Sequence, residues 1–356
     1  MRTRNHWPLV FLGFSLIAVL PIALVAETLT SHAQKSFPAA PGATVRVEAS
    51  WQDVKVTVRP GGTVDVTVDM KVTASADNAK KMLDACAPRF KESGGDITVT
   101  TRPEESLSLF SFFGTTRSEG TVAVAVPPGV SLDLRCGSGD MEVHGGLAGG
   151  KVRLTTGSGD QLLEGAASAV EADAGSGKVT LKLGPSAASV VTVRTGSGDQ
   201  VLEGGMRTLR ASAGSGEVTV RPGPPAESVE VTTGSGDIHL SGGAARFEAH
   251  TGSGSVEAED LSGDARIHTS SGDITAQWHQ TPAVGEVSVR TSSGDVKLRL
   301  PAAAVLSGRI ETSSGGIRSD FAGTSDRKER WEFSGQGGLR LDVETVSGDV
   351  TVHKSA

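Results

Sequence analysis

Residues 191–202 read VTVRTGSGDQVL, and this stretch shows the pattern on which the whole fold depends. Apolar and polar residues alternate before the tetrapeptide GSGD and alternate again after it, as they do in half-buried β-strands. The glycines on both sides of Ser197 permit backbone angles that other residues avoid. The stretch therefore predicts a strand, a tight Gly-Ser-Gly turn and a second strand.

The tetrapeptide recurs along the chain, as GSGD or as the variants GSGK, GSGE, GSGS, SSGD, SSGG and VSGD. Successive central serines are 18–22 residues apart, except that the last interval, of 33 residues, contains an insertion and a degenerate copy at 334–335. Residues four and six positions before each serine, and three positions after it, are mostly aliphatic. We expect the central serines to be structural turn residues: Ser138, Ser158, Ser176, Ser197, Ser215, Ser235, Ser253, Ser271, Ser293, Ser314 and Ser347.

A unit of about 20 residues cannot bury its apolar face alone, whereas stacked copies form a continuous core. We therefore expect an all-β protein, a single-stranded β-solenoid (a β-helix or roll) of about 12 rungs spaced about 4.8 Å apart. Such a stack would be a rod on the order of 55 Å long. A narrow aliphatic core also accounts for the scarcity of aromatic residues, which are ten Phe, four Trp and no Tyr.

The composition argues against several other classes of protein. The 46 glycines do not recur at every third position, so the chain is not collagen-like. A hydrophobic content of 37% and a formal net charge of only -7 argue against disorder. Because the charge balance is acidic and aromatic residues that could stack on bases are few, we expect no nucleic-acid partner.

The first 26 residues have the features of a signal anchor or signal peptide. Arg2 and Arg4 precede an uncharged apolar run at 9–26, which is near the lower length limit for crossing a bilayer. Small residues around 31–33 offer a cleavage site, so both a cleaved and an uncleaved segment are considered. The positive flank predicts that the rest of the chain is exported to the periplasmic or cell-surface side, with residues 9–26, if uncleaved, holding it in the inner (cytoplasmic) membrane.

The remaining chain divides by the regularity of its repeats. We expect 27–43 to be a linker, 44–130 to contain irregular N-terminal rungs, and 131–356 to be the regular solenoid. Residues 75–90 predict a short amphipathic helix, with Asp77 near its start, that caps the open end of the stack. An aromatic cluster at 106–114 either packs on this cap or contacts a membrane or partner.

The two cysteines, Cys86 and Cys136, lack the spacing of metal ligands. In an exported chain they could form a disulfide, but they could equally remain two buried thiols.

Stacking would align the acidic residues that end many of the turns. Calcium could bridge such carboxylates, but Lys178, Ser255 and Gly316 interrupt the column. We therefore expect each Asp to accept hydrogen bonds from the amides of its own turn. The candidate column contains Asp140, Asp160, Asp199, Asp237, Asp273, Asp295 and Asp349.

Motifs for catalysis or cofactor binding are missing from the sequence. The segment GSGK at 175–178 lacks the remaining residues of a phosphate-binding loop, and no nucleophile elbow occurs. We predict no catalytic residue, no cofactor and no metal site, although His250 and His268 occupy equivalent positions and should be outward neighbours. A threonine column should line the core near the turns: Thr156, Thr195, Thr233, Thr251, Thr269, Thr291 and Thr312.

Together with the repeated turns, the segment PPGVSLDLRCGSGDMEV at 127–143 resembles a bacterial family of candidate adhesins of unknown function, with SGSGD-type turns in a β-solenoid. The resemblance covers about residues 44–356 and departs from the family pattern at 320–339. It implies placement in the cell envelope or at the cell surface, with adhesion as a label rather than a mechanism.

These observations favour a non-enzymatic envelope protein that presents an extended surface to an unidentified protein or glycan. One alternative is an envelope regulatory or stress-response protein that docks a signalling partner. The other is an envelope polysaccharide-active enzyme, which would need a cluster of carboxylates that the repeat does not predict.

Overall fold

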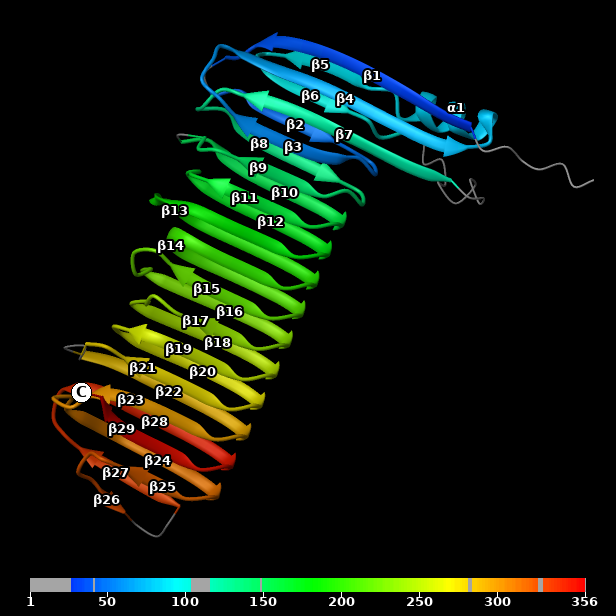
Figure 1. Ribbon diagram of the computed structural model, residues 1–356. Helices are drawn as coiled ribbons and strands as arrows, with labels where there is room; N and C mark the ends of the chain where they lie inside the picture. The colour runs from blue at the N-terminus through cyan, green and yellow to red at the C-terminus, as the bar shows by residue number, and fades with distance from the viewer. Residues whose placement is uncertain are drawn as a thin grey trace, which may run out of the picture.

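The computed structural model describes residues 27–40, 42–103, 116–147, 149–280, 284–325 and 329–355. These residues form an elongated stack of β-strands with one helix near the N-terminal end (Figure 1). The apolar run at 9–26 and the aromatic cluster at 106–114 lie outside the described residues. Within those described, no helix is both long enough and apolar enough to cross a membrane.

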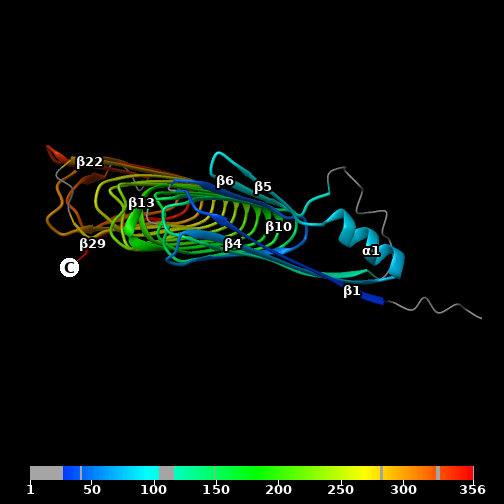
Figure 2. The same ribbon diagram turned by 90° about the horizontal axis from the view of Figure 1, so that it is seen from above.

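Parallel strands that precede the Gly-Ser-Gly turns form one side of the stack, which we call ladder A. Each turn reverses the chain, so the strand before it and the strand after it lie on opposite sides of the core (Figure 2). In spatial order, ladder A consists of β2 (Thr44–Glu48), β8 (Ser131–Cys136), β10 (Lys151–Ser158), β12 (Ala169–Ser176), the later parts of β13 (Val179–Ser197) and β14 (Gln200–Ser215), β16 (Ser228–Ser235), β18 (Arg246–Ser253), β20 (Asp264–Ser271), β22 (Val284–Ser293), β28 (Gly338–Ser347) and β24 (Leu306–Ser314).

The strands that follow the turns form the other side, ladder B. In spatial order, these strands are β3 (Asp53–Val58), β9 (Met141–His144), β11 (Gln161–Gly165), the first parts of β13 and β14, β15 (Val218–Pro222), β17 (Ile238–Leu240), β19 (Val256–Leu261), β21 (Ile274–Trp278), β23 (Val296–Pro301), β29 (Val350–Ser355) and β25 (Ile317–Ser319). The two ladders establish the all-β solenoid expected from the repeat.

Equivalent residues of successive repeats lie side by side, so the core consists of columns of similar side chains. On ladder A, for example, Val191 pairs with Leu209, and Val193 pairs with Ala211. All four are buried. The threonine column also faces the core, as predicted, and Thr269 donates a 3.1 Å hydrogen bond to the carbonyl of Gly254.

At the C-terminal end the spatial order of the repeats differs from their order in the sequence. The last repeat, β28 and β29, lies between β22/β23 and β24/β25 (Figure 1). The degenerate copy at 334–335 is not a further parallel rung. Instead, β27 (Arg330–Ser334) runs antiparallel to β24 and to the short β26 (Thr324–Ser325).

The N-terminal end is also built out of sequence order. Strands β2 and β3 form the rung beside β8 and β9, as expected for the irregular N-terminal rungs of 44–130. Beyond that rung lie β7 (Arg117–Val126), β4 (Thr63–Ala74) and β1 (Glu27–Pro38) on ladder B, and β6 (Asp96–Thr100) and β5 (Arg89–Ser93) on ladder A. The stretch 27–43, expected to be a linker, thus contains strand β1. Its outer face carries polar residues, so it lacks the apolar columns that identify the other strands.

Helix α1 (Ala76–Ala85) is shorter than expected and does not cap the stack. Residue Phe90, predicted to be helical, belongs to β5. Strand β4 and helix α1 extend to one side of the coils (Figure 2), and Val72 and Ala74 of β4 form a small buried cluster with Ala79 and Met82 of the helix. The antiparallel strands, rather than the helix, therefore cover the open end.

The cysteines are separate thiols, and both are buried. Burial raises the pKa of Cys86 and of Cys136. Cys136 occupies the position of the threonine column, and its Sγ accepts a 3.0 Å hydrogen bond from the amide of Gly139. Of the two alternatives left open by the sequence, the structure thus contains the pair of buried thiols.

Candidate binding surfaces

The Gly-Ser-Gly turns form one long edge of the solenoid, with their serines in register. Ser176 lies beside Ser197, and Ser197 lies beside Ser215. All eleven turn serines are exposed, and in the part of the chain that is described their hydroxyls form no hydrogen bond. The structure therefore gives these residues their predicted place in the turns, but no side-chain contact that requires serine.

Stacking does explain the glycine that follows the serine. Gly216 has a φ of +133°, and a Cβ atom there would lie 2.5 Å from the carbonyl oxygen of Gly198 in the preceding turn. Its amide donates a 3.0 Å hydrogen bond to the carbonyl of Ser235 in the following turn. The close approach of successive backbones thus leaves no room for a side chain.

The aspartates of the turns form a hydrogen-bonded column along the same edge. Oδ1 of Asp160 accepts a 2.8 Å hydrogen bond from the amide of Lys178, and Oδ1 of Asp237 accepts a 2.7 Å bond from the amide of Ser255. Six more carboxylates accept the backbone amide of a residue in the next turn along the stack. In each pair the acceptor is named first: Asp53 and Asp140, Asp140 and Asp160, Asp199 and Glu217, Asp273 and Asp295, Asp295 and Asp349, and Asp349 and Gly316.

The expectation that each Asp accepts amides of its own turn is therefore wrong. The turn amides already donate to carbonyls of the neighbouring turn, as Val218 does to Asp237 at 3.0 Å. The carboxylate reaches instead to the next turn along the stack. Because the donor is a backbone amide, residues without a carboxylate can also donate to the column, as Lys178, Ser255 and Gly316 do.

Among the residues that the structure describes, the aspartate column and the outward histidines do not bring metal-ligating side chains together. In the described ranges, no group of three or more His, Cys, Asp or Glu side chains is arranged to hold a metal ion. His250 and His268 are outward neighbours, as predicted, with ring centroids 6.2 Å apart. His250 lies 3.0 Å from a carboxylate oxygen of Glu248 on its own strand.

On ladder A, outward side chains of opposite charge form ion pairs between neighbouring rungs. Asp133 is the most enclosed member, with guanidinium groups of Arg46 at 2.9 Å and Arg135 at 3.0 Å. Burial raises the pKa of Asp133, but the hydrogen bonds and charges of the two arginines outweigh this effect and hold it below its ordinary value. Further ion pairs on this face join Arg153 with Glu171, Arg194 with Asp173, Arg210 with Glu230, and Arg290 with Asp342.

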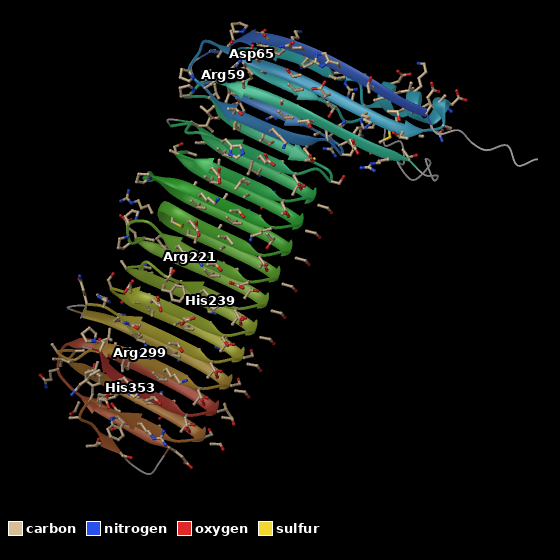
Figure 3. The ribbon with its side chains drawn as sticks, viewed as in Figure 1. Arg59, Asp65, Arg221, His239, Arg299 and His353 are labelled. Carbon is tan, nitrogen blue, oxygen red and sulfur yellow. The ribbon has the colours of Figure 1, made fainter. Side chains whose placement is uncertain are left out.

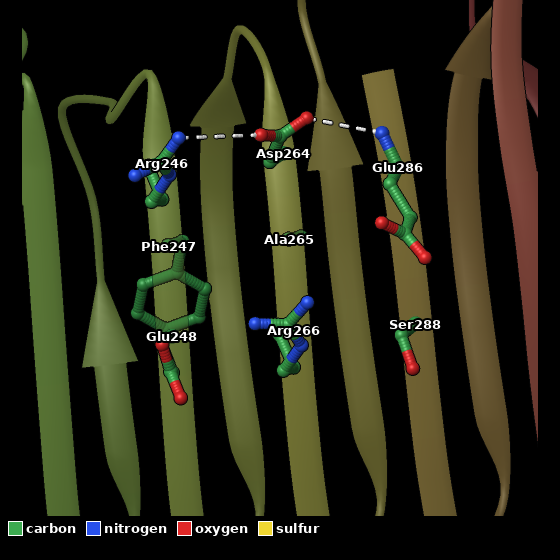
Figure 4. Close-up of a pocket in the computed structure, with 8 residues that line it drawn as sticks. All are labelled: Arg246, Phe247, Glu248, Asp264, Ala265, Arg266, Glu286 and Ser288. Carbon is green, nitrogen blue, oxygen red and sulfur yellow. Dashed lines mark hydrogen bonds and ion pairs between the residues drawn. The ribbon is translucent and has the colours of Figure 1, made fainter.

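A shallow depression of about 250 Å³ lies on ladder A across β18, β20 and β22 (Figure 4). Asp264 accepts a 3.0 Å hydrogen bond from the amide of Glu286, and it lies 3.8 Å from the guanidinium of Arg246. Glu248 and Arg266 also line the depression. Its charges are of both signs, so it does not select a ligand of one charge.

Most of ladder B is compensated in the same way. Nζ of Lys182 lies 2.8 Å from Glu164, and this hydrogen bond lowers the pKa of Glu164 and raises that of Lys182. Arg221 lies 2.8 Å from Glu203 on the neighbouring rung. At the C-terminal end, however, Lys297, Arg299 and Arg318 are exposed and form no ion pair with the described residues; Figure 3 labels Arg299.

Sequence reasoning did not find this cationic group. Lys297 and Arg318 occupy equivalent positions in different repeats, and Thr351 of the inserted strand β29 lies between them. The alternation of polar residues identified both as outward positions. The basic residues at outward positions of the last repeats could thus have indicated a cationic surface. Which side chains flank them, however, depends on the spatial order of the rungs.

Comparison with known proteins places the chain in a family but does not assign a function. No functionally curated protein matches its sequence. Solved structures with a similar arrangement include a candidate adhesin of Bacteroides fragilis (12% identity, 91% of this chain and 97% of the other, TM-score 0.27) and a candidate adhesin of Parabacteroides distasonis (12%, 90% and 97%, 0.33). A candidate lipid-binding protein of Parabacteroides distasonis is also similar (10%, 91% and 97%, 0.32).

The family described as Toastrack DUF4097 matches residues 46–259 and 206–353, which together span both ladders and the rung out of sequence order. The chain therefore belongs to the Toastrack DUF4097 family.

Proposed function

We propose that this protein is a non-enzymatic binding module of the cell envelope, which presents the outward faces of its solenoid to a protein or glycan partner. The observation that carries the proposal is the regular alignment of outward side chains on both ladders. Arg153 and Glu171, for example, pair across adjacent rungs of ladder A, and Glu164 and Lys182 pair across adjacent rungs of ladder B. Such faces offer many equivalent contact points along a rigid support, as in other solenoid proteins.

Export of the chain is part of this proposal. It is supported by the two arginines that precede the apolar run at 9–26. Within the same proposal, about 12 rungs carry the binding faces, and backbone hydrogen bonds between successive turns hold the coils in register.

Deletion and complementation in the source organism test the proposal. We expect deletion to reduce attachment of whole cells to their natural surface, and we expect the full chain to restore it. The control is the Asp160→Asn variant, which keeps a side-chain oxygen at the turn and changes no outward face of a ladder. Unchanged attachment after deletion, together with an altered envelope stress response, would instead support the regulatory alternative.

A further inference from the structure

The C-terminal end of ladder B carries an excess of positive charge. Lys297 and Arg299 lie on β23, and Arg318 lies on β25. Strand β29 lies between these strands, with Thr351 beside both Lys297 and Arg318 and His353 beside Arg299. We call the surface formed by Lys297, Arg299, Arg318 and His353 the cationic end face; Figure 3 labels Arg299 and His353.

The contrast with the rest of ladder B makes this surface unusual. Lys55 lies 3.5 Å from Glu142, Lys182 lies 2.8 Å from Glu164, and Arg221 lies 2.8 Å from Glu203. Acidic partners of this kind are missing for the three cations of the end face, as far as the described ranges extend. The excess is local, because the chain as a whole has a formal net charge of -7.

The carboxylates nearest to the end face already have hydrogen-bond donors. Asp320 lies 3.2 Å from Nδ1 of His353 and accepts a 3.1 Å hydrogen bond from the amide of Lys354. These contacts lower the pKa of Asp320. Two residues before Lys297 along the strand, Asp295 accepts the amide of Asp349 at 2.8 Å. These groups reduce the positive potential of the face but do not form ion pairs with its lysine and arginines.

The geometry of the end face suits an extended anion rather than a small one. Lys297 and Arg299 are two residues apart on one strand, about 7 Å, and β23 and β25 are two strand spacings apart, about 10 Å. Cations spread over such distances on an open surface can meet successive charges of a polymer that lies across the strands.

We propose that the cationic end face binds an acidic polysaccharide, a linear glycan that carries repeated carboxylate or phosphate groups. This inference rests on the proposed binding function and names the class of partner for one face. A nucleic acid is disfavoured because the face exposes no aromatic ring: the nearby Phe321 is buried and lies under Nζ of Lys354 at 5.1 Å. An anionic lipid surface is disfavoured because the face lies at the end of the stack opposite β1, the strand that follows the apolar run (Figure 1).

Binding of the purified full chain to immobilised polygalacturonate and to phosphomannan tests the proposal, with neutral dextran as the blank. The variant K297Q/R299Q/R318Q removes the three cations. The matched control K55Q/K182Q/R221Q removes three ion-paired cations from the same ladder and changes the net charge equally. We expect at least tenfold weaker binding for the first variant, a change within about twofold for the second, and weaker binding by the wild-type chain as salt is raised.

Equal losses for the two variants would show that only the overall charge matters and would overturn the proposal. The same conclusion follows if the wild-type chain binds neither acidic polymer, or if it binds phosphatidylglycerol vesicles more tightly through the same three residues. Attachment of cells that carry K297Q/R299Q/R318Q separates this inference from the proposed function. If attachment is lost on deletion but fully restored by this variant, the binding function stands and the end face is not its site.

Discussion

The second glycine of each turn shows how strongly a single residue can be constrained by the next coil. Its positive φ already disfavours other residues, and at Gly216 the carbonyl of Gly198 fills the space of a Cβ atom. The serine before it is exposed, so the two residues of one turn are held in place for different reasons.

Replacement of this glycine by alanine tests the constraint. We expect Gly216→Ala to lower stability by about 2–3 kcal/mol, because the side chain adds backbone strain and displaces a stacked turn. The control is Gly61→Ala, where no atom lies within 4 Å of the added Cβ. Urea unfolding followed by circular dichroism gives the comparison, and equal midpoints for the two variants would contradict the account.

The aspartate column makes a prediction that separates hydrogen bonding from charge. Asp160→Ala removes the acceptor of the Lys178 amide, so we expect a loss of about 1 kcal/mol. Asp160→Asn keeps an oxygen in the same place and should lie within about 0.5 kcal/mol of the wild type. If the carboxylates instead held calcium, both variants would weaken a calcium-dependent rise in melting temperature, and chelation would lower that of the wild type.

The pH dependence of stability should report on Asp133. Its folded pKa is lowered by Arg46 and Arg135, so its ionised form stabilises the folded state above the unfolded pKa of about 3.9. We expect Asp133→Asn to be less stable than the wild type by about 1–2 kcal/mol at neutral pH. The difference should shrink as the pH falls below about 4 and through the folded pKa. Melting curves from pH 7 to pH 3 measure it, and a constant difference across this range would refute the assignment.

At the scale of the element, the repeated strands were predictable and their spatial order was not. Alternation around Ser197 identified the strand that ends at the turn, its buried Val193 and the inward Thr195, because burial follows period two within a strand. The repeats that contain Ser293, Ser314 and Ser347 have interchangeable patterns, so each could stack on either of the others. Only the pairing shows that the Ser347 repeat lies in the middle.

The same limit applies to the N-terminal strands. Strand β1 pairs along its whole length with β4, from Glu27 opposite Ala74 to Pro38 opposite Thr63. Its exposed faces carry few apolar residues, so the backbone hydrogen bonds with β4 define it rather than a side-chain pattern. The neighbours of Lys297 and Arg299 were unpredictable for a related reason, because the inserted strand β29 places Thr351 and His353 beside them.

Truncation tests the inserted rung. In the described structure, β25 pairs with β29 alone, so a chain that ends at Gly337 should leave residues 317–319 without a partner. Hydrogen exchange should then lose protection across β25, while β24, which also pairs with β27, and β8 to β13 stay protected, because contacts in a stack are between neighbours. The control is a chain that ends at Lys354 and therefore keeps β28 and nearly all of β29. Retained protection at 317–319 would mean that β25 has another partner and would contradict the assigned order.

At the scale of the whole molecule, the stack separates two kinds of surface. Along most of its length, outward charges are compensated between rungs, as Arg210 and Glu230 are on ladder A. Lys297, Arg299 and Arg318, which form no ion pair with the described residues, lie at the end far from β1, where Figure 3 labels Arg299. A rigid stack of this shape would hold such a face away from the membrane if residues 9–26 act as an anchor, which suits a protein that contacts partners beyond its own attachment point.

Photo-crosslinking in intact cells tests the binding account most directly. A diazirine-bearing residue is placed at Thr351 on the cationic end face, at Thr180 in the middle of ladder B, or at Ser212 on ladder A, and adducts of the full chain are measured by their mass. The binding account predicts adducts on at least one of these outward faces, and the inference about the cationic end face further predicts adducts at position 351 that disappear in the K297Q/R299Q/R318Q background. The absence of adducts at all three positions, in cells that produce the chain normally, would contradict it.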